Sequence, residues 1–395
     1  MKETLLSLVS LFGLHKAANR KLRLRLLAIV GLAFLFTSCQ KEMNKPAQNE
    51  NVGVAGGRNI SNATATMEIF ASGFNSPRGL TFGPDGDLYV AEGGTGGTDS
   101  TQCIQVIAPV GPYRGSETGG RISKIAPNGT VTTVTDQLPS SQTSPMLGNL
   151  ISGVADVAFV GNDLYAILAG AGCSHGVNSL PNGIVKVNSD GSFKLIADLS
   201  AWQQAHPVAH PEEDDFEPDG TWYSMINVRG DLYAVEPNHG EMVKVTTNGA
   251  ISLVIDISKT QGHIVPTAVA YHGNFFVGNL YTFPVVAGSS NIYKITPSGN
   301  IKVWASGFTT VVGVAFDSKG RMYVLENSSV SGPGPTPGTG DIVRVNNNGS
   351  KQVIFSGLTV PTAMTFGPDG NLYVSNLGFG APPGAGQVLK IHIND

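Results

Sequence analysis

The chain has 395 residues, of which 50 are glycine and 23 are proline, and only 14% are charged. Globular proteins average about 7% glycine and about 25% charged residues, so this composition favours an all-β protein with many turns over a helical one. The net charge of −4, with no basic block after residue 25, argues against nucleic acid as a partner.

The first 39 residues are expected to be a signal peptide that ends in a lipid anchor. Basic residues between Lys16 and Arg25 precede an apolar run, 26–36, that is too short for a comfortable membrane span. Two small residues then precede Cys39, as in a bacterial lipoprotein signal, although Phe36 stands where that pattern prefers leucine. The alternative is an ordinary signal peptide. Lipidation of Cys39 would place the protein in the cell envelope, as an outer-membrane lipoprotein that faces the periplasm or the cell surface.

Residues 40–66 are polar and without periodicity, which predicts a flexible tether. The remaining region, 67–395, contains six copies of one pattern: an apolar segment, a tight turn and an aromatic-rich strand. The aromatic anchors of the six copies are Tyr89, Tyr165, Tyr233, Phe276, Tyr323 and Tyr373. The turns are typical of β-hairpins, and a second hairpin half follows each anchor, so each repeat has four strands. Such repeats bury their faces only by stacking on one another.

The sixth repeat has three strands, and its fourth strand is expected at the other end of the domain. Residues 67–74, MEIFASGF, resemble the fourth strands at 302–308 and 352–358. We therefore predict a six-bladed β-propeller in which this N-terminal strand completes the last blade and closes the ring. An open β-solenoid is the alternative, but it does not explain where the missing strand lies.

The hairpin turns are short, and the six longer segments all fall on one face of the predicted propeller. They are 93–118, 169–182, 199–222, 280–289, 327–339 and 377–385. Long loops on a rigid scaffold commonly carry binding or catalysis, although they can also merely cap the channel. Cys103 and Cys173 lie in two of these loops, on adjacent blades, and we expect them to form a disulfide in an exported protein. Two cysteines alone cannot supply the four ligands of a zinc site.

Two sets of residues are expected around the axis. Three positions after each anchor stand Glu92, Leu168, Glu236, Asn279, Glu326 and Asn376, and before each inner strand stand Arg78, Ala155, Ser224, Thr267, Val312 and Thr362. Arg78, the single cation among them, would neutralise the glutamates or hold an anionic ligand through its planar fork. The alternative is that these side chains only satisfy backbone groups at strand ends.

Histidines in the loops are the remaining candidates. His239 follows Glu236 closely and is an acid or base candidate, with an ordinary surface histidine as the alternative. His206 and His210 precede the acidic run 212–215, but prolines break any helix that would align them, so a solvated acidic loop is the better interpretation. No metal or cofactor is predicted. The candidate ligand-binding residues are Arg78, Glu92, Glu236, His239, Thr267, Asn279, Glu326, Thr362 and Asn376.

Two stretches resemble the ScyD/ScyE family. They are SGFNSPRGLTFGPDGDLYVAEGGTGG (72–97) and IVPTAVAYHGNFFVGNLYTFPVVAGSSNIYKI (264–295), the second followed by WASGFTTVVGVAFDSKGRMYVLE. The chain departs from the family at 236–240, where an Asp-Ala-Gly-Gly-Asn run is usual. The resemblance covers about 67–380 and implies an exported NHL-like propeller of unestablished chemistry. The family is named for scytonemin biosynthesis, but the lipid anchor suggests a different setting.

Two classes of function fit this architecture. The first is a monomeric, non-catalytic module that binds a small molecule, a glycan or a protein on the loop face. The alternative is a hydrolase or lyase, as in gluconolactonases and streptogramin lyases. Gluconolactonase-like propellers carry metal ligands before their inner strands, where this chain has arginine, alanine, valine and threonines, so an oxygen-rich divalent site of that type is not expected. A different site built from the glutamates stays open. No catalytic motif or quinone cofactor motif supports other enzymes.

Overall fold

The computed structural model describes residues 65–394, apart from 101–102, 104–105, 147–149, 212–215 and 347. The predicted signal peptide with Cys39, nearly all of the tether, and the acidic run 212–215 lie outside the described residues. None of the helices in the described part is long and apolar enough to cross a membrane.

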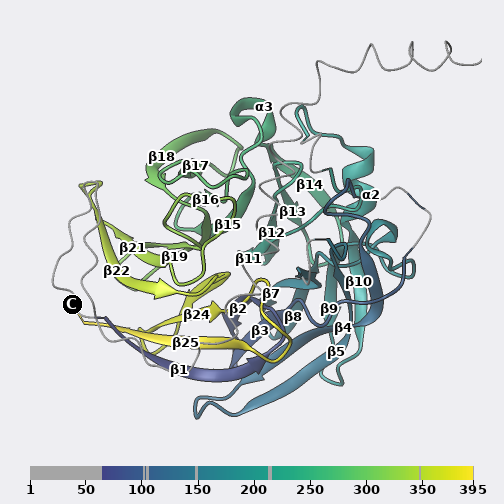
Figure 1. The fold of residues 1–395 in the computed structure, drawn as a ribbon, viewed down its shortest axis with the longest axis horizontal. Coiled ribbons are helices and arrows are strands. Elements are labelled where there is room, and N and C mark those ends of the chain that lie inside the picture. Colours follow the sequence, from purple (N-terminus) through teal and green to yellow (C-terminus); the bar gives the residue numbers. More distant parts are fainter. Residues whose placement is uncertain are drawn as a thin grey trace, which may run out of the picture.

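Six antiparallel sheets are arranged around one axis as a six-bladed β-propeller, which confirms the predicted fold (Figure 1). The first blade consists of β2 (Pro77–Phe82), β3 (Leu88–Glu92), β4 (Arg114–Ile125), β5 (Val131–Gln142) and the short β6 (Ile151–Ser152). The second consists of β7 (Val154–Val160), β8 (Asp163–Leu168), β9 (Gly183–Val187) and β10 (Phe193–Asp198). The third consists of β11 (Ser224–Val228), β12 (Asp231–Glu236), β13 (Glu241–Val245) and β14 (Ile251–Asp256).

The fourth to sixth blades follow the same order. The fourth consists of β15 (Pro266–Tyr271), β16 (Phe275–Asn279), β17 (Ser290–Ile295) and β18 (Ile301–Phe308). The fifth consists of β19 (Val311–Phe316), β20 (Met322–Glu326), β21 (Gly340–Val345) and β22 (Lys351–Leu358). The sixth consists of β23 (Ala363–Phe366), β24 (Leu372–Asn376), β25 (Gly386–Ile393) and β1 (Ala65–Phe74). In the described part of the chain, three short helices lie in the connections: η2 (Cys173–His175), α2 (Leu199–Ala205) and α3 (Ser258–Gln261).

The N-terminal strand closes the ring as predicted. Strand β1 pairs antiparallel with β25, from Ala65 opposite Ile393 to Phe74 opposite Gly386. The strand starts two residues earlier than the sequence pattern indicated. Phe74 is fully buried and packs with Leu88 and Tyr373, which belong to the first and last blades. Closure therefore buries apolar surface as well as pairing an edge.

Local chemistry explains why the repeated pattern forms hairpins. The anchor Tyr89 donates from its hydroxyl to Asp85 Oδ2 at 2.9 Å, and Tyr373 makes the same bond to Asp369. Each aspartate lies in the turn before its tyrosine, so the bond fastens the turn to the second strand. Gly86 and Gly370 follow these aspartates with φ of 83° and 78°, a conformation that favours glycine. Between blades, apolar side chains pack face to face and form the core.

Candidate functional site

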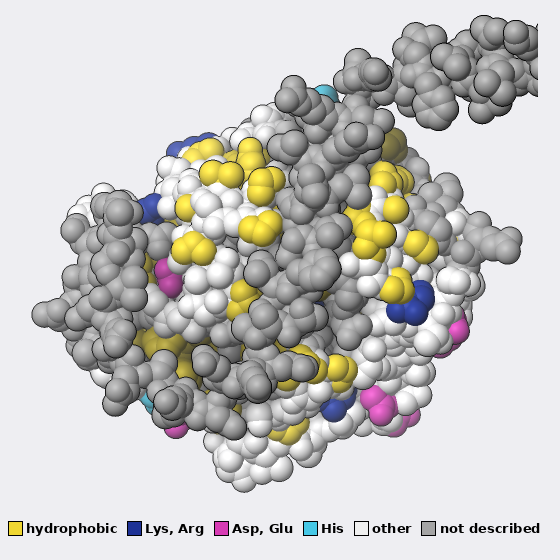
Figure 2. All heavy atoms as spheres, viewed as in Figure 1, with side chains coloured by type: hydrophobic (Ala, Val, Ile, Leu, Met, Phe, Trp, Pro, Cys, Tyr) yellow, Lys and Arg dark blue, Asp and Glu magenta, His cyan; other side chains and the backbone are white. Residues whose placement is uncertain are grey.

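A cavity of about 340 Å³ lies at the inner mouth of the propeller, among the segments that connect the blades. Its lining is largely apolar and includes six aromatic side chains: Tyr113, Trp222, Tyr223, Tyr281, Phe283 and Phe379. Large apolar side chains are also exposed in the connecting segments, among them Ile107, Met146, Phe216, Tyr281, Phe283, Val286 and Val330. Figure 2 shows hydrophobic side chains gathered in several places on the face drawn there, beside few charged ones. A mostly apolar cavity of this size suits a small molecule.

A β-bulge turns one residue of most inner strands toward the cavity. In the first blade Pro77 pairs with Glu92 and Leu80 pairs with Val90, so the register shifts around Arg78. Such a bulge re-aims the extra side chain, here into the cavity. The equivalent residues around the ring, all of which line the cavity, are Arg78, Ala155, Tyr223, Thr267, Val312 and Thr362.

The prediction for the third blade was wrong by one residue. Ser224 was expected at the cavity, but Tyr223 occupies that position. Strand β11 pairs with β12 without a bulge, from Ser224 opposite Val235 onward, which places Ser224 inside the sheet. Its hydroxyl lies 3.2 Å from Asp156 Oδ2 of the neighbouring blade, and that oxygen also accepts from the Met225 N–H at 2.8 Å. Burial raises the pKa of Asp156 to about 7.

Five predicted ligand-binding residues do not line this cavity. They are Glu92, Glu236, Asn279, Glu326 and Asn376, and all five are buried. The three glutamates each accept a bond of 2.6–2.7 Å from a backbone N–H of the segment that enters the blade, and these donors belong to Asn75, Thr221 and Thr309. Asn376 accepts from Thr359 N at 2.9 Å in the same manner. The amide of Asn279 accepts from Asn291 N at 2.7 Å and donates to Ile264 O at 2.9 Å. These side chains therefore satisfy backbone groups at strand ends, which was the alternative interpretation.

His239 also stands behind the cavity wall and is buried. Its Nδ1 lies 3.2 Å from Glu236 Oε2, and its backbone N–H donates to the same carboxylate. Burial works against a charged imidazole, but the charge of Glu236, its hydrogen bond to the ring and the charges of Glu241 and Glu217 together outweigh burial, so the pKa of His239 lies above its usual value. Burial and the charge of Glu236 raise the pKa of the nearby Glu241 to about 7. The cluster therefore holds the segment that carries Thr221 in place.

Of the nine predicted residues, Arg78, Thr267 and Thr362 line the cavity. The two threonine hydroxyls donate to backbone carbonyls of the next blade, Val311 O at 2.5 Å and Pro77 O at 2.7 Å. Both hydroxyl oxygens keep capacity to accept a hydrogen bond from a ligand, because a hydroxyl has two lone pairs.

Arg78 is half-buried in the cavity wall. Its Nη2 donates to Ile151 O at 2.6 Å, and its guanidinium lies 5.7 Å from the centre of the Phe379 ring. Burial lowers the pKa of Arg78. Among the residues that the structure describes, no carboxylate pairs with it. A guanidinium has five N–H donors, so most of its hydrogen-bonding capacity remains for a ligand.

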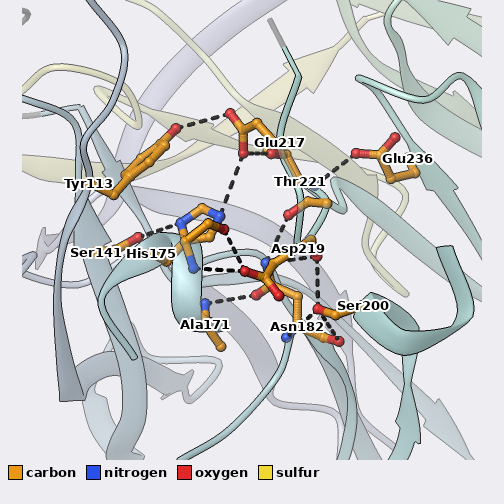
Figure 3. Close-up of polar contacts among 12 residues, drawn as sticks. Tyr113, Ser141, Ala171, His175, Asn182, Ser200, Glu217, Asp219, Thr221 and Glu236 are labelled. Atoms are coloured by element: carbon orange, nitrogen blue, oxygen red, sulfur yellow. Dashed lines mark hydrogen bonds and ion pairs between the residues drawn. The ribbon is translucent and has the colours of Figure 1, made fainter. Parts of the chain in front are cut away.

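The sequence reasoning missed Glu217, whose carboxylate lies on the cavity wall and is held by a buried polar network (Figure 3). Tyr113 donates to its Oε1 at 3.1 Å and the Thr221 hydroxyl donates to its Oε2. His175 Nε2 lies 3.5 Å from Oε2, and His175 Nδ1 lies 3.0 Å from the Ser141 hydroxyl. The network combines residues from the first blade with two loops of the second and third blades. These loops share no repeated motif, so no pattern in the sequence identifies Glu217 or its partners as site residues.

Helix η2 positions His175 within this network. Asp219 Oδ2 accepts from the backbone N–H and the hydroxyl of Ser174, at 2.8 and 2.5 Å. Gly172, just before the helix, has φ 96°, and a Cβ there would lie 2.4 Å from Asp219 Cγ, so the close approach requires glycine. The structure also joins Cys103 to Cys173 in a disulfide, with their Cα atoms 6.2 Å apart. The connecting segments of the first two blades are thus joined covalently.

The donor set does not fit a divalent metal. Among the described residues, no group of three or more His, Cys, Asp or Glu side chains is arranged to hold one. The six positions that point to the axis carry no carboxylate, whereas calcium and magnesium require several oxygen ligands.

No family model and no curated protein matches the chain. Among solved structures, a gluconolactonase from Xanthomonas campestris is similar with a TM-score of 0.51 and 10% identity, over 84% of this chain and 90% of that one. A putative oxidoreductase (glucose dehydrogenase) from Thermus thermophilus has a TM-score of 0.52 and 16% identity, over 83% and 100% of the two chains. The PQQ-bound aldose sugar dehydrogenase from Streptomyces coelicolor has a TM-score of 0.51 and 13% identity, over 84% and 99%. These similarities show a shared propeller fold.

Proposed function

We propose that the protein is an exported, lipid-anchored β-propeller that binds a small molecule in the axial cavity, with Arg78 contacting an acidic group of that ligand. The lipoprotein pattern that ends at Cys39 supports the anchor and a location at the outer membrane. The stretches that resemble the ScyD/ScyE family support an exported propeller. The apolar lining and the volume of about 340 Å³ favour a small molecule over a glycan or a protein.

The position of Arg78 is the observation that carries this proposal. A charge that is partly withdrawn from water is costly unless it is paired, and Arg78 has only a backbone carbonyl and an aromatic ring as partners among the described residues. A carboxylate or phosphate would accept two parallel bonds from the guanidinium fork. The aromatic and aliphatic wall would cover the rest of the ligand, which gains affinity from burial of its apolar surface.

Calorimetric titration with matched acids and neutral amides tests the proposal. We expect acids with an apolar ring to bind more tightly than their amides. Arg78→Gln should weaken binding of the acids by roughly 10- to 150-fold, the value of a hydrogen bond to a charged group. Arg229→Gln, an exposed arginine in the turn between β11 and β12, is the matched control and should leave binding unchanged. Equal binding of acids and amides, or an unaffected Arg78→Gln variant, would refute the role of Arg78.

A hydrolase or lyase is the second candidate, and the network around Glu217 favours it. A carboxylate on the cavity wall with an imidazole 3.5 Å away places two groups suited to proton transfer side by side. Incubation of the protein with lactone and ester libraries, followed by mass spectrometry, tests this candidate. Turnover that Glu217→Gln abolishes would establish an enzyme, whereas binding without any turnover would leave the ligand-binding role alone.

A further inference from the structure

Two opposite charges share the cavity wall without neutralising each other. Among the described lining residues, Arg78 carries the guanidinium and Glu217 carries the carboxylate. No ion pair joins these two side chains. Tyr113 interacts with both groups, because its hydroxyl donates to Glu217 and it also interacts electrostatically with Arg78. The cavity therefore presents a positive group and a negative group beside an apolar wall.

Neighbouring side chains hold the carboxylate of Glu217 in a fixed position on the cavity wall. Glu217 is only 4% exposed, yet among the described residues its charge has no lysine or arginine partner. The neutral hydroxyls of Tyr113 and Thr221 donate to its two oxygens. His175 lies 3.5 Å away, a distance too long for a strong hydrogen bond. The carboxylate thus retains capacity to accept a further bond from a donor inside the cavity.

We propose that the ligand is dipolar: a small molecule with an apolar body, one carboxylate that binds Arg78 and one protonated amine that binds Glu217. Apolar amino acids and short peptides are the chemical class that carries this combination. An ammonium has three donors, and a carboxylate has about four lone-pair sites, of which Tyr113 and Thr221 occupy two. This inference rests on the proposed binding role of Arg78 and adds the second recognition group, which selects against simple acids.

A set of matched probes tests the inference on the intact domain by calorimetric titration. L-phenylalanine and glycyl-phenylalanine carry both charges, 3-phenylpropanoate lacks the amine, and phenethylamine lacks the carboxylate. We expect at least one dipolar probe to bind 10-fold or more tightly than both singly charged probes. Tighter or equal binding of 3-phenylpropanoate would overturn the inference and leave the role of Arg78 intact. No binding of any dipolar probe at 10 mM would also overturn it.

Variants then assign each charge to its residue. Glu217→Gln should remove the advantage of the dipolar probe over 3-phenylpropanoate, whereas Arg78→Gln should weaken the binding of both probes. Glu68→Gln, on the exposed strand β1, is the control for a lost carboxylate. A Glu217→Gln variant that keeps the full advantage would overturn the inference. If Glu217→Gln fails to fold, as judged by its melting transition, the comparison of probes on the natural protein remains decisive.

Discussion

The hydroxyl of Tyr223 donates to the backbone carbonyl of Thr362 at 3.0 Å, from the third blade to the sixth. These two blades lie opposite each other in a ring of six, so the side chain spans the axis. Both residues line the cavity. The bond therefore gives the cavity a floor at the centre of the propeller, and burial of the phenol raises the pKa of Tyr223 to about 12, which keeps it a neutral donor.

Removal of the Tyr223 hydroxyl should weaken the contact across the axis, while the aromatic ring stays in place. Tyr223→Phe deletes one hydrogen bond, and we expect the free energy of unfolding to fall by about 0.5–1.5 kcal/mol in urea titrations. Tyr281→Phe is the control, because Tyr281 is 38% exposed at the cavity. An unchanged free energy of unfolding for Tyr223→Phe would show that the bond across the axis contributes nothing.

The strand-end glutamates should prove structural. Glu326→Ala would leave the fully buried backbone N–H of Thr309 without its carboxylate partner, and an unsatisfied buried donor costs about 1–3 kcal/mol. Glu68→Ala, at an exposed position, should change stability by less than about 0.5 kcal/mol. Ligand affinity should be the same in both variants. If Glu326→Ala lost ligand affinity but kept its stability, Glu326 would belong to the binding site after all.

The pH dependence of stability should reflect Asp156. Its pKa in the folded protein, about 7, lies above the value of 3.8 for a solvated aspartate, so the folded state binds the proton more tightly. The resulting stabilisation is present below about pH 4 and is lost as the pH rises through 7. Relative to the natural protein, Asp156→Asn should therefore gain stability between pH 5 and pH 8 in urea titrations. A stability difference that is constant over this range would contradict the raised pKa.

The lipid anchor can be tested directly by fractionation. Cys39→Ala removes the predicted lipidation site, and we expect the variant to leave the membrane fraction, because it would lack the acyl chains that anchor the protein. Natural protein in the same strain is the control. Retention of the variant in the membrane pellet through high-salt washing would contradict the lipoprotein prediction.

Removal of β1 should destabilise the whole domain. A variant that lacks residues 1–74 exposes the edge of β25 and the apolar contacts of Phe74, so its melting temperature should fall well below that of a variant lacking only 1–62. Equal melting temperatures would contradict the closure of the ring by this strand.

The parts of the fold and of the site that could be predicted are those that belong to the repeated sequence pattern. The tyrosine anchors recur with their turns, so the blades could be counted, and the inner-strand position that holds Arg78, Thr267 and Thr362 could be located. Tyr223 was missed because the register that sets Ile226 opposite the anchor Tyr233 is visible only in the structure. Sequence places Glu326 at a strand end, but it does not show whether the side chain turns to the axis or to the backbone beside it. Glu217 was missed because it lies in a loop, 199–222, that shares no repeated motif with the other blades.

The pairing of β1 with β25 has a consequence for the order in which the domain can fold. The first strand of the domain to emerge from the ribosome or from a translocation pore has its partner at the far end of the chain. Until β25 has formed, the ring stays open, β1 has no partner strand and β24 keeps an unpaired edge. Contacts so distant in sequence form slowly, because a long loop must close before they contribute. A propeller closed in this way can complete its ring only after its last strand has formed.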